Sequence, residues 1–367
     1  PYGKPKFIEQ FRSLIWCDKK NIISWNQDFF NLDNGIVSYS KNKPMISQIF
    51  DELNFEKYFG KKRSPAEKIE ERHMNIASSL QKRTEELIFE ILERAFKKTG
   101  IRKLCLSGGV AQNSVANGKI VSNTSFDEVY IPSAGRDAGI SMGSAQYHFF
   151  NNLQKMRVEP LYNANLGISF ENFEIKNILD SLKLKYNFIE DDLIFHYVAN
   201  AISANKVIGF FDGNAEFGPR ALGSRSILAD PRNSKAQKLL NEKIKKRESF
   251  RPFAPSILEE FGDEYFINYQ FTPFMERVLP IKKEKQQLIP AVTHVDGSGR
   301  LQSVKKELRP RYYSLIKAFY EITGIPILIN TSFNENEPVV NIPEEAIDCY
   351  LRTDMDMLVL GNYILEK

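Results

Sequence analysis

Apolar residues recur at three- and four-residue spacing along the segment from Lys68 to Lys98, with Gln, Arg, Glu and Lys between them. This period predicts an amphipathic helix that Gly100 ends. Short apolar runs with the length of strands follow further along the chain, at 103–106, 128–131, 207–211, 325–329 and 357–360. Helical patterns are expected at 234–245, 311–322 and 343–351, the last with a proline at its start.

Strands that alternate with helices predict an α/β architecture. Residues 151–166 are polar and are expected to form a linker. The chain is therefore divided into residues 1–155 and 166–367. At 367 residues it is long enough for two domains, each with its own core.

Composition excludes some classes of protein. Lys+Arg number 50 against Asp+Glu at 46, so the net charge of +4 argues against a nucleic-acid binder. No apolar run approaches the ~20 residues that span a bilayer. The three cysteines are scattered and predict neither a disulfide framework nor a zinc site, which favours a cytoplasmic setting.

The most informative segment runs from Phe217 to Arg232, with the sequence FGPRALGSRSILADPR. It follows the predicted strand 207–211. Arg220 and Arg225 are separated by small residues, so backbone groups and guanidinium groups can approach an anion together. We therefore expect these arginines to bind phosphate or carboxylate.

Further candidates for anion binding follow in the same half of the chain. A basic run at 243–247 includes Lys245 and leads into Arg251-Pro252-Phe253-Ala254-Pro255, a stiff segment around an arginine. The segment 294–300 ends at Arg300, and Asn330 and Ser332 follow the predicted strand 325–329. A solvated face for the basic run and a plain turn at 330–334 are the alternatives.

Residues upstream form a second candidate site. Gly108 and Gly109 lie between a predicted strand and a helix and are followed by Asn113, an arrangement suited to a nucleotide. Asp137 lies between Gly135 and Gly139 in a similar loop, where a carboxylate could bind a metal ion. The alternatives are a tight turn for the glycines and a helix cap for Asp137.

These motifs together resemble a known family. FGPRALGSRSILADPR, HVDGSGRLQ and NTSFN, with LSGGVAQNSVANG upstream, resemble the O-carbamoyltransferases of the nodulation and antibiotic-tailoring type. The resemblance implies part of an actin-like ATPase-type domain at 1–155 and a YrdC-like domain at 166–367. It also implies that the N-terminal part of the actin-like domain, with its HxxxH motif, is missing here. A separate N-terminal chain or a homo-oligomer would then be the partner.

The resemblance also assigns roles. Arg220, Lys245, Arg300 and Ser332 would grip the phosphate and carbamoyl groups, while Arg225 and Asn330 would contact the cofactor. Carbamoyl phosphate, ATP and Mg²⁺ would give a carbamoyl-adenylate, whose carbamoyl group passes to a small hydroxylated acceptor. In the actin-like part, Gly108, Gly109 and Asn113 would bind nucleotide. Asp137 would help to hold Fe²⁺ or another divalent ion.

Two departures and two alternatives qualify this interpretation. The turn Asn334–Pro338 is one residue tighter than the family's turn, which usually contains glycine, and Asn214-Ala215 replaces a basic residue and methionine. One alternative is a threonylcarbamoyl-adenylate synthase for tRNA modification, which would use bicarbonate and threonine. The other is a non-catalytic half of a split enzyme.

Overall fold

The computed structural model describes the chain except for residues 1, 20–21, 31–38, 41–42 and 45–49, so Pro1, where the resemblance begins, lies outside it. The side chains at 39–40, 43–44 and 243 are also outside the description. The chain forms two compact units, residues 1–103 with 120–128, and residues 104–119 with 129–367. This grouping follows contacts and does not test the expected division at 155–166, which stays a prediction.

The first unit is built around one long helix, α3 (Glu71–Thr99), on which α1 (Ile8–Leu14) packs. A small aromatic core holds it together, with Phe11, Phe29 and Phe59 buried. Gly100 ends α3 in the left-handed conformation with φ of 67°, as its position predicted. The other elements are β1 (Ile15–Trp16), β2 (Ser24–Trp25), β3 (Tyr39–Ser40), β4 (Lys43–Pro44), α2 (Glu52–Phe59) and α5 (Ile120–Asn123).

Strands β5 (Lys103–Cys105) and β6 (Glu128–Tyr130) pair with each other, and the chain passes between the two units within them. The helix expected after the glycine loop is broken into α4 (Ser114–Asn117) and α5. The next helix of the second unit is α6 (Gly139–Tyr147).

The second unit contains a nine-stranded mixed sheet in the order β11-β12-β10-β13-β9-β8-β14-β15-β7. Only the pairs β10–β12 and β8–β14 are parallel, which confirms the α/β class. The strands are β7 (Asn187–Phe188), β8 (Ile208–Phe211), β9 (Arg225–Ala229), β10 (Ala254–Leu258), β11 (Arg277–Pro280), β12 (Ser298–Val304), β13 (Ile327–Ser332), β14 (Met357–Leu360) and β15 (Tyr363–Glu366).

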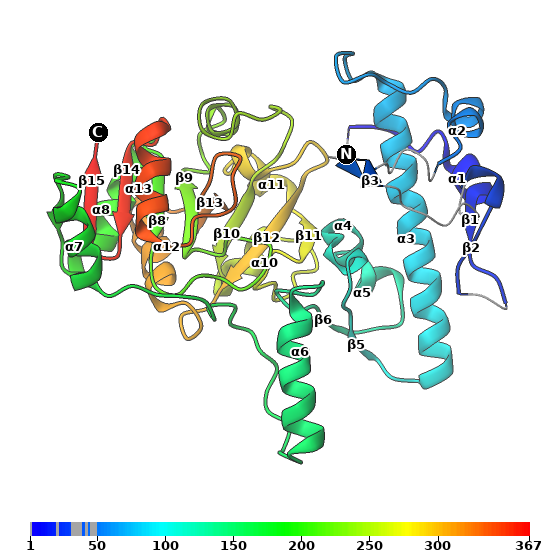
Figure 1. Ribbon diagram of the computed structural model, residues 1–367, viewed down its shortest axis with the longest axis horizontal. Helices are drawn as coiled ribbons and strands as arrows, with labels where there is room; N and C mark the ends of the chain where they lie inside the picture. Colours follow the sequence, from blue (N-terminus) through cyan, green and yellow to red (C-terminus); the bar gives the residue numbers. More distant parts are fainter. Residues whose placement is uncertain (1, 20–21, 31–38, 41–42, 45–49) are drawn as a thin grey trace. The chain divides into compact units, whose positions relative to one another are not determined.

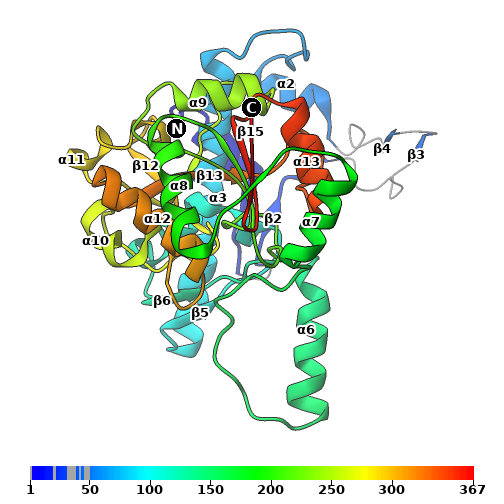
Figure 2. The ribbon, with the colours of Figure 1, turned by 90° about the vertical axis from the view of Figure 1, so that its left-hand side faces the viewer.

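Helices cover both faces of this sheet. Figure 2 shows α8 (Asp191–Ser203) and α12 (Pro310–Thr323) on one side of the strands, and α7 (Asn172–Ser181) and α13 (Pro343–Arg352) on the other. The helix expected at 234–245 is instead a short α9 (Ala236–Leu239) followed by a π-helical turn at Leu240–Ile244. Two further short helices are α10 (Gly262–Tyr265) and α11 (Lys283–Gln286). Figure 1 labels the strands of this sheet from β11 to β15 and shows them side by side in this order.

No helix in the described part of the chain is long and apolar enough to cross a membrane. The three cysteines, Cys17, Cys105 and Cys349, are free thiols.

Candidate anion-binding site

Strand register brings the predicted motifs of the C-terminal half to one end of the sheet. Ala254 at the start of β10 pairs with Asn330 near the end of β13, and Ser332 at that end pairs with Ser226 at the start of β9. Because β12 runs parallel to β10, its first residues lie at the same end. The segments that meet there are 217–224, 245–253, 294–297 and 333–337. We call Arg220, Lys245, Arg247, Arg300 and Ser332 the sheet-end site.

The loop that leads into β9 is organised by the protein's own carboxylate. Glu216 Oε1 accepts hydrogen bonds from the backbone N–H groups of Leu222 at 2.8 Å and Ser224 at 2.5 Å. Gly223 has φ of +103°, and a Cβ there would lie 2.2 Å from the ring of Tyr312. The chain's own anion therefore occupies these backbone donors, which leaves the guanidinium group of Arg220 as this loop's group for an external anion.

Three arginines of the site are partly buried and lack carboxylate partners. Neither Arg220, Arg247 nor Arg300 forms an ion pair with a carboxylate of the described residues. Burial, with the neighbouring charges of Arg220 and Arg247, lowers the pKa of Arg300 to about 9. Burial also lowers the pKa of Arg220 and of Arg247. Cations that repel one another in a poorly solvated place favour an anionic ligand.

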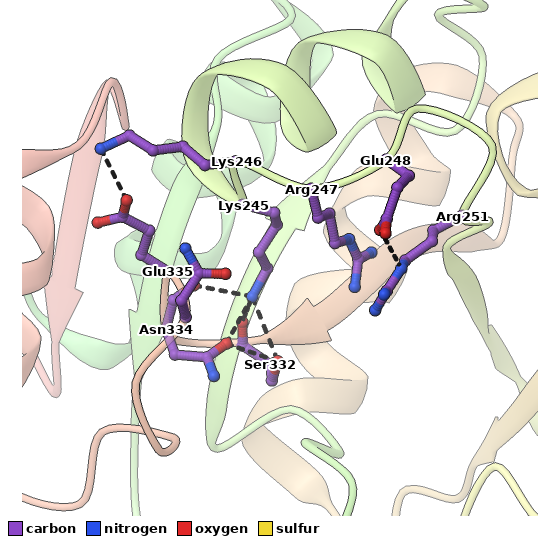
Figure 3. A pocket seen from close by; sticks show the side chains of 9 residues that line it. Lys245, Lys246, Arg247, Glu248, Arg251, Ser332, Asn334 and Glu335 are labelled. Atoms are coloured by element: carbon purple, nitrogen blue, oxygen red, sulfur yellow. Dashed lines mark hydrogen bonds and ion pairs between the residues drawn. The ribbon is translucent and has the colours of Figure 1, made fainter. Parts of the chain in front are cut away.

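Lys245 lies at the same end of the sheet and is held by neutral oxygens. Its Nζ donates to the carbonyl oxygens of Ser332 at 2.5 Å and Asn334 at 2.8 Å, and contacts Ser332 Oγ at 3.2 Å and Asn334 Oδ1 at 2.6 Å. Figure 3 shows this arrangement beside Arg247. Burial, with a smaller effect of the Arg247 charge, lowers the pKa of Lys245 to about 7.

A cavity of about 580 Å³ is lined by three members of the sheet-end site, Lys245, Arg247 and Ser332, and not by Arg220 or Arg300. Two ion pairs line its wall: Arg251 with Glu248 at 2.8 Å, and Lys246 with Glu335 at 2.7 Å. Its other lining residues are Lys245, Arg247, Ser332, Asn334 and Asn336. The basic run at 243–247 thus turns two of its members, Lys245 and Arg247, toward a cavity rather than forming only a solvated face. The side chain of Lys243 lies outside the description.

The turn before β12 supports Arg300. Ser298 Oγ donates to Asp296 Oδ1 at 2.6 Å, so it can only accept from His294 Nδ1, which lies 3.1 Å away. Burial lowers the pKa of His294 to about 4, and the charge of Arg300 acts in the same direction. A neutral His294 therefore donates a hydrogen bond to Ser298, the first residue of the strand that carries Arg300.

Two predicted cofactor residues have contacts that belong to the fold. Arg225 is 1% exposed; its Nη1 donates to Gly213 O at 2.9 Å and its Nη2 to Ile168 O at 3.1 Å. Its guanidinium group also lies 3.6 Å from the ring centre of Phe211. Asn330 is equally buried and donates to Ser256 Oγ and Gln302 Oε1. Their assignment to a cofactor stays a prediction.

Sequence reasoning missed two residues that shape the site. Glu216 organises the arginine loop, and Asn334 holds Lys245. The alternation of Asn330, Ser332 and Asn334 along β13 and its continuation was a signal for the second, because side chains two apart in a strand point to the same side. Nothing in the sequence marked Glu216 as the loop's internal anion.

The glycine loop and the Asp137 loop lie side by side. Gly108 N donates to Gly135 O at 2.5 Å, and Gly108 has φ of +105° with open space where a side chain would be. Asn113 Oδ1 accepts from Ala116 N at 3.1 Å and so caps α4. Asp137 is exposed and caps no helix, because the N-cap residue of α6 is Ala138 without a side-chain hydrogen bond. The helix-cap alternative for Asp137 was therefore wrong.

Within the described ranges, no three His, Cys, Asp or Glu side chains come together as ligands for a metal ion. Asp137 remains a predicted metal ligand. His73, the histidine at the start of α3, accepts a hydrogen bond from Glu70 N through its Nδ1 at 2.9 Å, which is a helix-start contact.

Comparison with known proteins places these motifs in a family. The model described as Carbamoyltransferase C-terminus matches residues 199–367, and the model described as Carbamoyltransferase N-terminus matches residues 1–146. The chain belongs to the carbamoyltransferase family. This confirms the family resemblance that the sequence motifs carried.

Three relatives show how far the likeness extends. Nodulation protein NolNO of Sinorhizobium fredii is 39% identical over 81% of this chain and 44% of its own length. NolO of Bradyrhizobium diazoefficiens is 39% identical over 81% of this chain and 55% of its own. An uncharacterised Synechocystis protein is 38% identical over 100% and 62%. The chain thus spans between 44% and 62% of the length of these relatives.

Two solved structures are weakly similar. P. abyssi Sua5, complexed with L-threonine, matches 48% of this chain and 48% of its own at 15% identity, with a TM-score of 0.34. Full-length HypF in the phosphate- and nucleotide-bound form matches 64% of this chain and 36% of its own at 14% identity, with a TM-score of 0.35. At these scores neither likeness bears on fold or ligand.

Proposed function

We propose that the sheet-end site binds ATP and carbamoyl phosphate and forms carbamoyl-adenylate, the activated donor for carbamoyl transfer to a hydroxyl group. One observation carries the proposal: Arg220, Arg247 and Arg300 converge without carboxylate partners beside Lys245. Two polyanions repel each other, so a site that joins them needs several fixed cations.

The proposed reaction balances with one water. Water cleaves carbamoyl phosphate to carbamate and phosphate; a carbamate oxygen then attacks the α-phosphorus of ATP, and the bond to pyrophosphate breaks. Arg220 and Arg300 would offset the charge on the phosphoryl oxygens, and Ser332 Oγ would orient the carbamoyl group. The site would have to exclude water to protect the adenylate from hydrolysis.

Magnesium, if used, would supply charge neutralisation on the phosphates. Glu248 and Glu335 on the cavity wall are already in ion pairs, and the described residues contain no group of three His, Cys, Asp or Glu side chains that could hold a metal ion. The ion would therefore enter with ATP and keep phosphate and water oxygens as its main ligands, as Mg²⁺ commonly does.

Transfer to the acceptor is the second proposed step. We assign nucleotide or donor binding in this step to the loop Gly108–Asn113 and metal binding to Asp137. This division matches the expected actin-like and YrdC-like parts, and each remains a proposal.

The test is release of pyrophosphate from ATP and Mg²⁺ by purified protein. Carbamoyl phosphate should support release, and Arg220→Ala should abolish it while Lys176→Ala, which breaks an exposed ion pair on α7 at 2.6 Å, should not. Bicarbonate with threonine forms the second arm of the assay. Release in that arm alone would establish the threonylcarbamoyl-adenylate alternative, and folded protein silent in both arms would refute the proposal.

A further inference from the structure

The turn that holds Lys245 is itself clamped by charges from α13. Arg352, the last residue of that helix, forms ion pairs through its guanidinium group with Glu335 and with Glu337, and its Nε contacts Asp348 Oδ2 at 3.0 Å. Lys246 Nζ reaches the other side of Glu335 at 2.7 Å. A planar guanidinium group that binds two carboxylates of one turn fixes their separation as well as their position.

The clamped turn is well ordered internally. Glu337 accepts hydrogen bonds from the backbone N–H groups of Glu335 and Asn336, each at 3.0 Å. Burial opposes ionisation here, but these backbone bonds and the charge of Arg352 outweigh it and lower the pKa of Glu337 to about 2. The carboxylate that faces Arg352 is therefore ionised throughout the physiological range.

A continuous chain of contacts leads from this clamp to the ammonium group. Glu337 bonds Arg352 through its carboxylate, and its carbonyl oxygen accepts from Asn334 Nδ2 at 2.6 Å. The other end of the same amide, Asn334 Oδ1, lies 2.6 Å from Lys245 Nζ. Because one amide group has both contacts, moving the turn moves the oxygen that holds Lys245.

Helix α13 also carries a second titratable group that lies near Lys245. Cys349 lies one turn before Arg352 on α13 and is 1% exposed, and burial raises the pKa of its thiol to about 12, so it stays neutral. Besides Arg247, the titratable groups near enough to act on Lys245 are Cys349, on α13, and Glu337, on the turn that α13 clamps. Of these two, only Glu337 is ionised in the physiological range.

We propose that Arg352 is a positioning residue of the sheet-end site, which acts through Glu337 and Asn334 to fix the Lys245 ammonium group over the cavity. This inference rests on the proposed function for its meaning, but the contacts that carry it are separate from the ligand. Arg352 itself does not line the cavity. A clamp built of five charged side chains is stronger than isolated surface pairs, because each side chain is already restrained by another.

The experiment compares Arg352→Ala with two matched variants. Asp348→Ala removes only the contact within α13 and leaves the turn clamped, and Arg352→Lys keeps the charge but loses the fork. The readouts are the titration of Lys245, followed by NMR of labelled lysine side chains, the affinity for pyrophosphate by calorimetry, and the melting temperature.

Arg352→Ala should open the turn to water, raise the pKa of Lys245 toward its ordinary range and weaken pyrophosphate binding about tenfold, since a small misplacement of a binding group is costly. Arg352→Lys should fall between Arg352→Ala and the wild type, and Asp348→Ala should stay within about twofold of the wild type. If Arg352→Ala does not fold, Glu337→Gln tests the same link.

A lower melting temperature with unchanged Lys245 titration and unchanged pyrophosphate affinity would overturn the inference and leave Arg352 a purely structural residue. The result is separable from the proposed function. Suppose that the wild type binds pyrophosphate and that Arg352→Ala raises the pKa of Lys245, but that the wild type releases no pyrophosphate from ATP and carbamoyl phosphate. This result would retain the positioning role of Arg352 and refute the proposed reaction.

Discussion

The sheet-end site and the glycine loop at 107–113 both resembled nucleotide sites in the sequence, but their structures differ. At the sheet end, three arginines and Lys245 lie partly or fully buried, and neighbouring positive charge contributes to lowering the pKa of each. At the glycine loop, Gly108 is open and Asp137 is exposed. The difference teaches that a motif defines a site most clearly when folding leaves its charged groups uncompensated.

The two places also use their backbone differently. Glu216 occupies the backbone N–H groups of Leu222 and Ser224 in the arginine loop, so we expect side chains to supply most of the anion binding there. In the glycine loop, Gly108 N is taken by Gly135, and the side-chain oxygen of Asn113 caps α4. Both loops are therefore preorganised, but only the first presents unpaired positive charge.

The largest expected effect separates these regions by activity. Arg300→Ala should lower pyrophosphate release at least about 100-fold, the usual cost of removing a group that stabilises charge in the transition state. The assay is steady-state release with ATP and carbamoyl phosphate, with circular dichroism to confirm folding. Loss of less than threefold would remove Arg300 from the site.

The next effect concerns pH. The pKa of Lys245 is lowered to about 7, so between pH 7 and the ordinary lysine range the unfolded chain binds more protons than the folded one. The free energy of unfolding should therefore rise with pH across this window, by up to about 1.4 kcal/mol per pH unit from this group. Urea unfolding at pH 7.5 and 9.0 measures the rise.

Lys245→Met is the control for this pH dependence, because it keeps much of the side chain's volume without the charge. Its unfolding free energy should lack the contribution of Lys245, so the difference between variant and wild type isolates that group from other titrating side chains. If the unfolding free energies of the two proteins changed equally with pH, the pKa of Lys245 would not be lowered in the folded state.

The smallest effect is expected at the glycine-loop region. Asp137→Ala should change pyrophosphate release by less than about twofold, because the Asp137 side chain is exposed and no hydrogen bond or ion pair among the described residues joins it to the sheet-end site. The same assay provides the measurement. A large loss of pyrophosphate release would show that Asp137 takes part in the same reaction step as the sheet-end site, which would contradict the expected difference between the two regions.

Much of the fold could be predicted where strands are wholly apolar. The runs that became β8 and β14 are buried at every position, and both were expected as strands. The long amphipathic helix α3 and its glycine stop were also predicted. In these elements the local pattern and the tertiary environment favour the same structure.

Three of the strands that build the site, β9, β10 and β12, were not predicted, for a physical reason. β9, β10 and β12 carry Ser226, Ser256 and Gln302 on buried positions, where these side chains hydrogen bond to one another or to the backbone. Such buried polar residues hide both the alternation and the continuous apolar run by which strands are found. The residues of the site were predicted by motif, whereas their convergence depended on register that no local pattern contains.

The central claim is that Arg220 and Arg300 serve one anion site. A double-mutant cycle tests it most directly, with pyrophosphate affinity measured by calorimetry at fixed ionic strength for the wild type, Arg220→Ala, Arg300→Ala and the double variant. The account predicts that the loss in the double variant differs from the sum of the single losses by at least about 0.5 kcal/mol, as expected for groups that share a ligand. Additive losses would contradict it and leave two separate patches of charge.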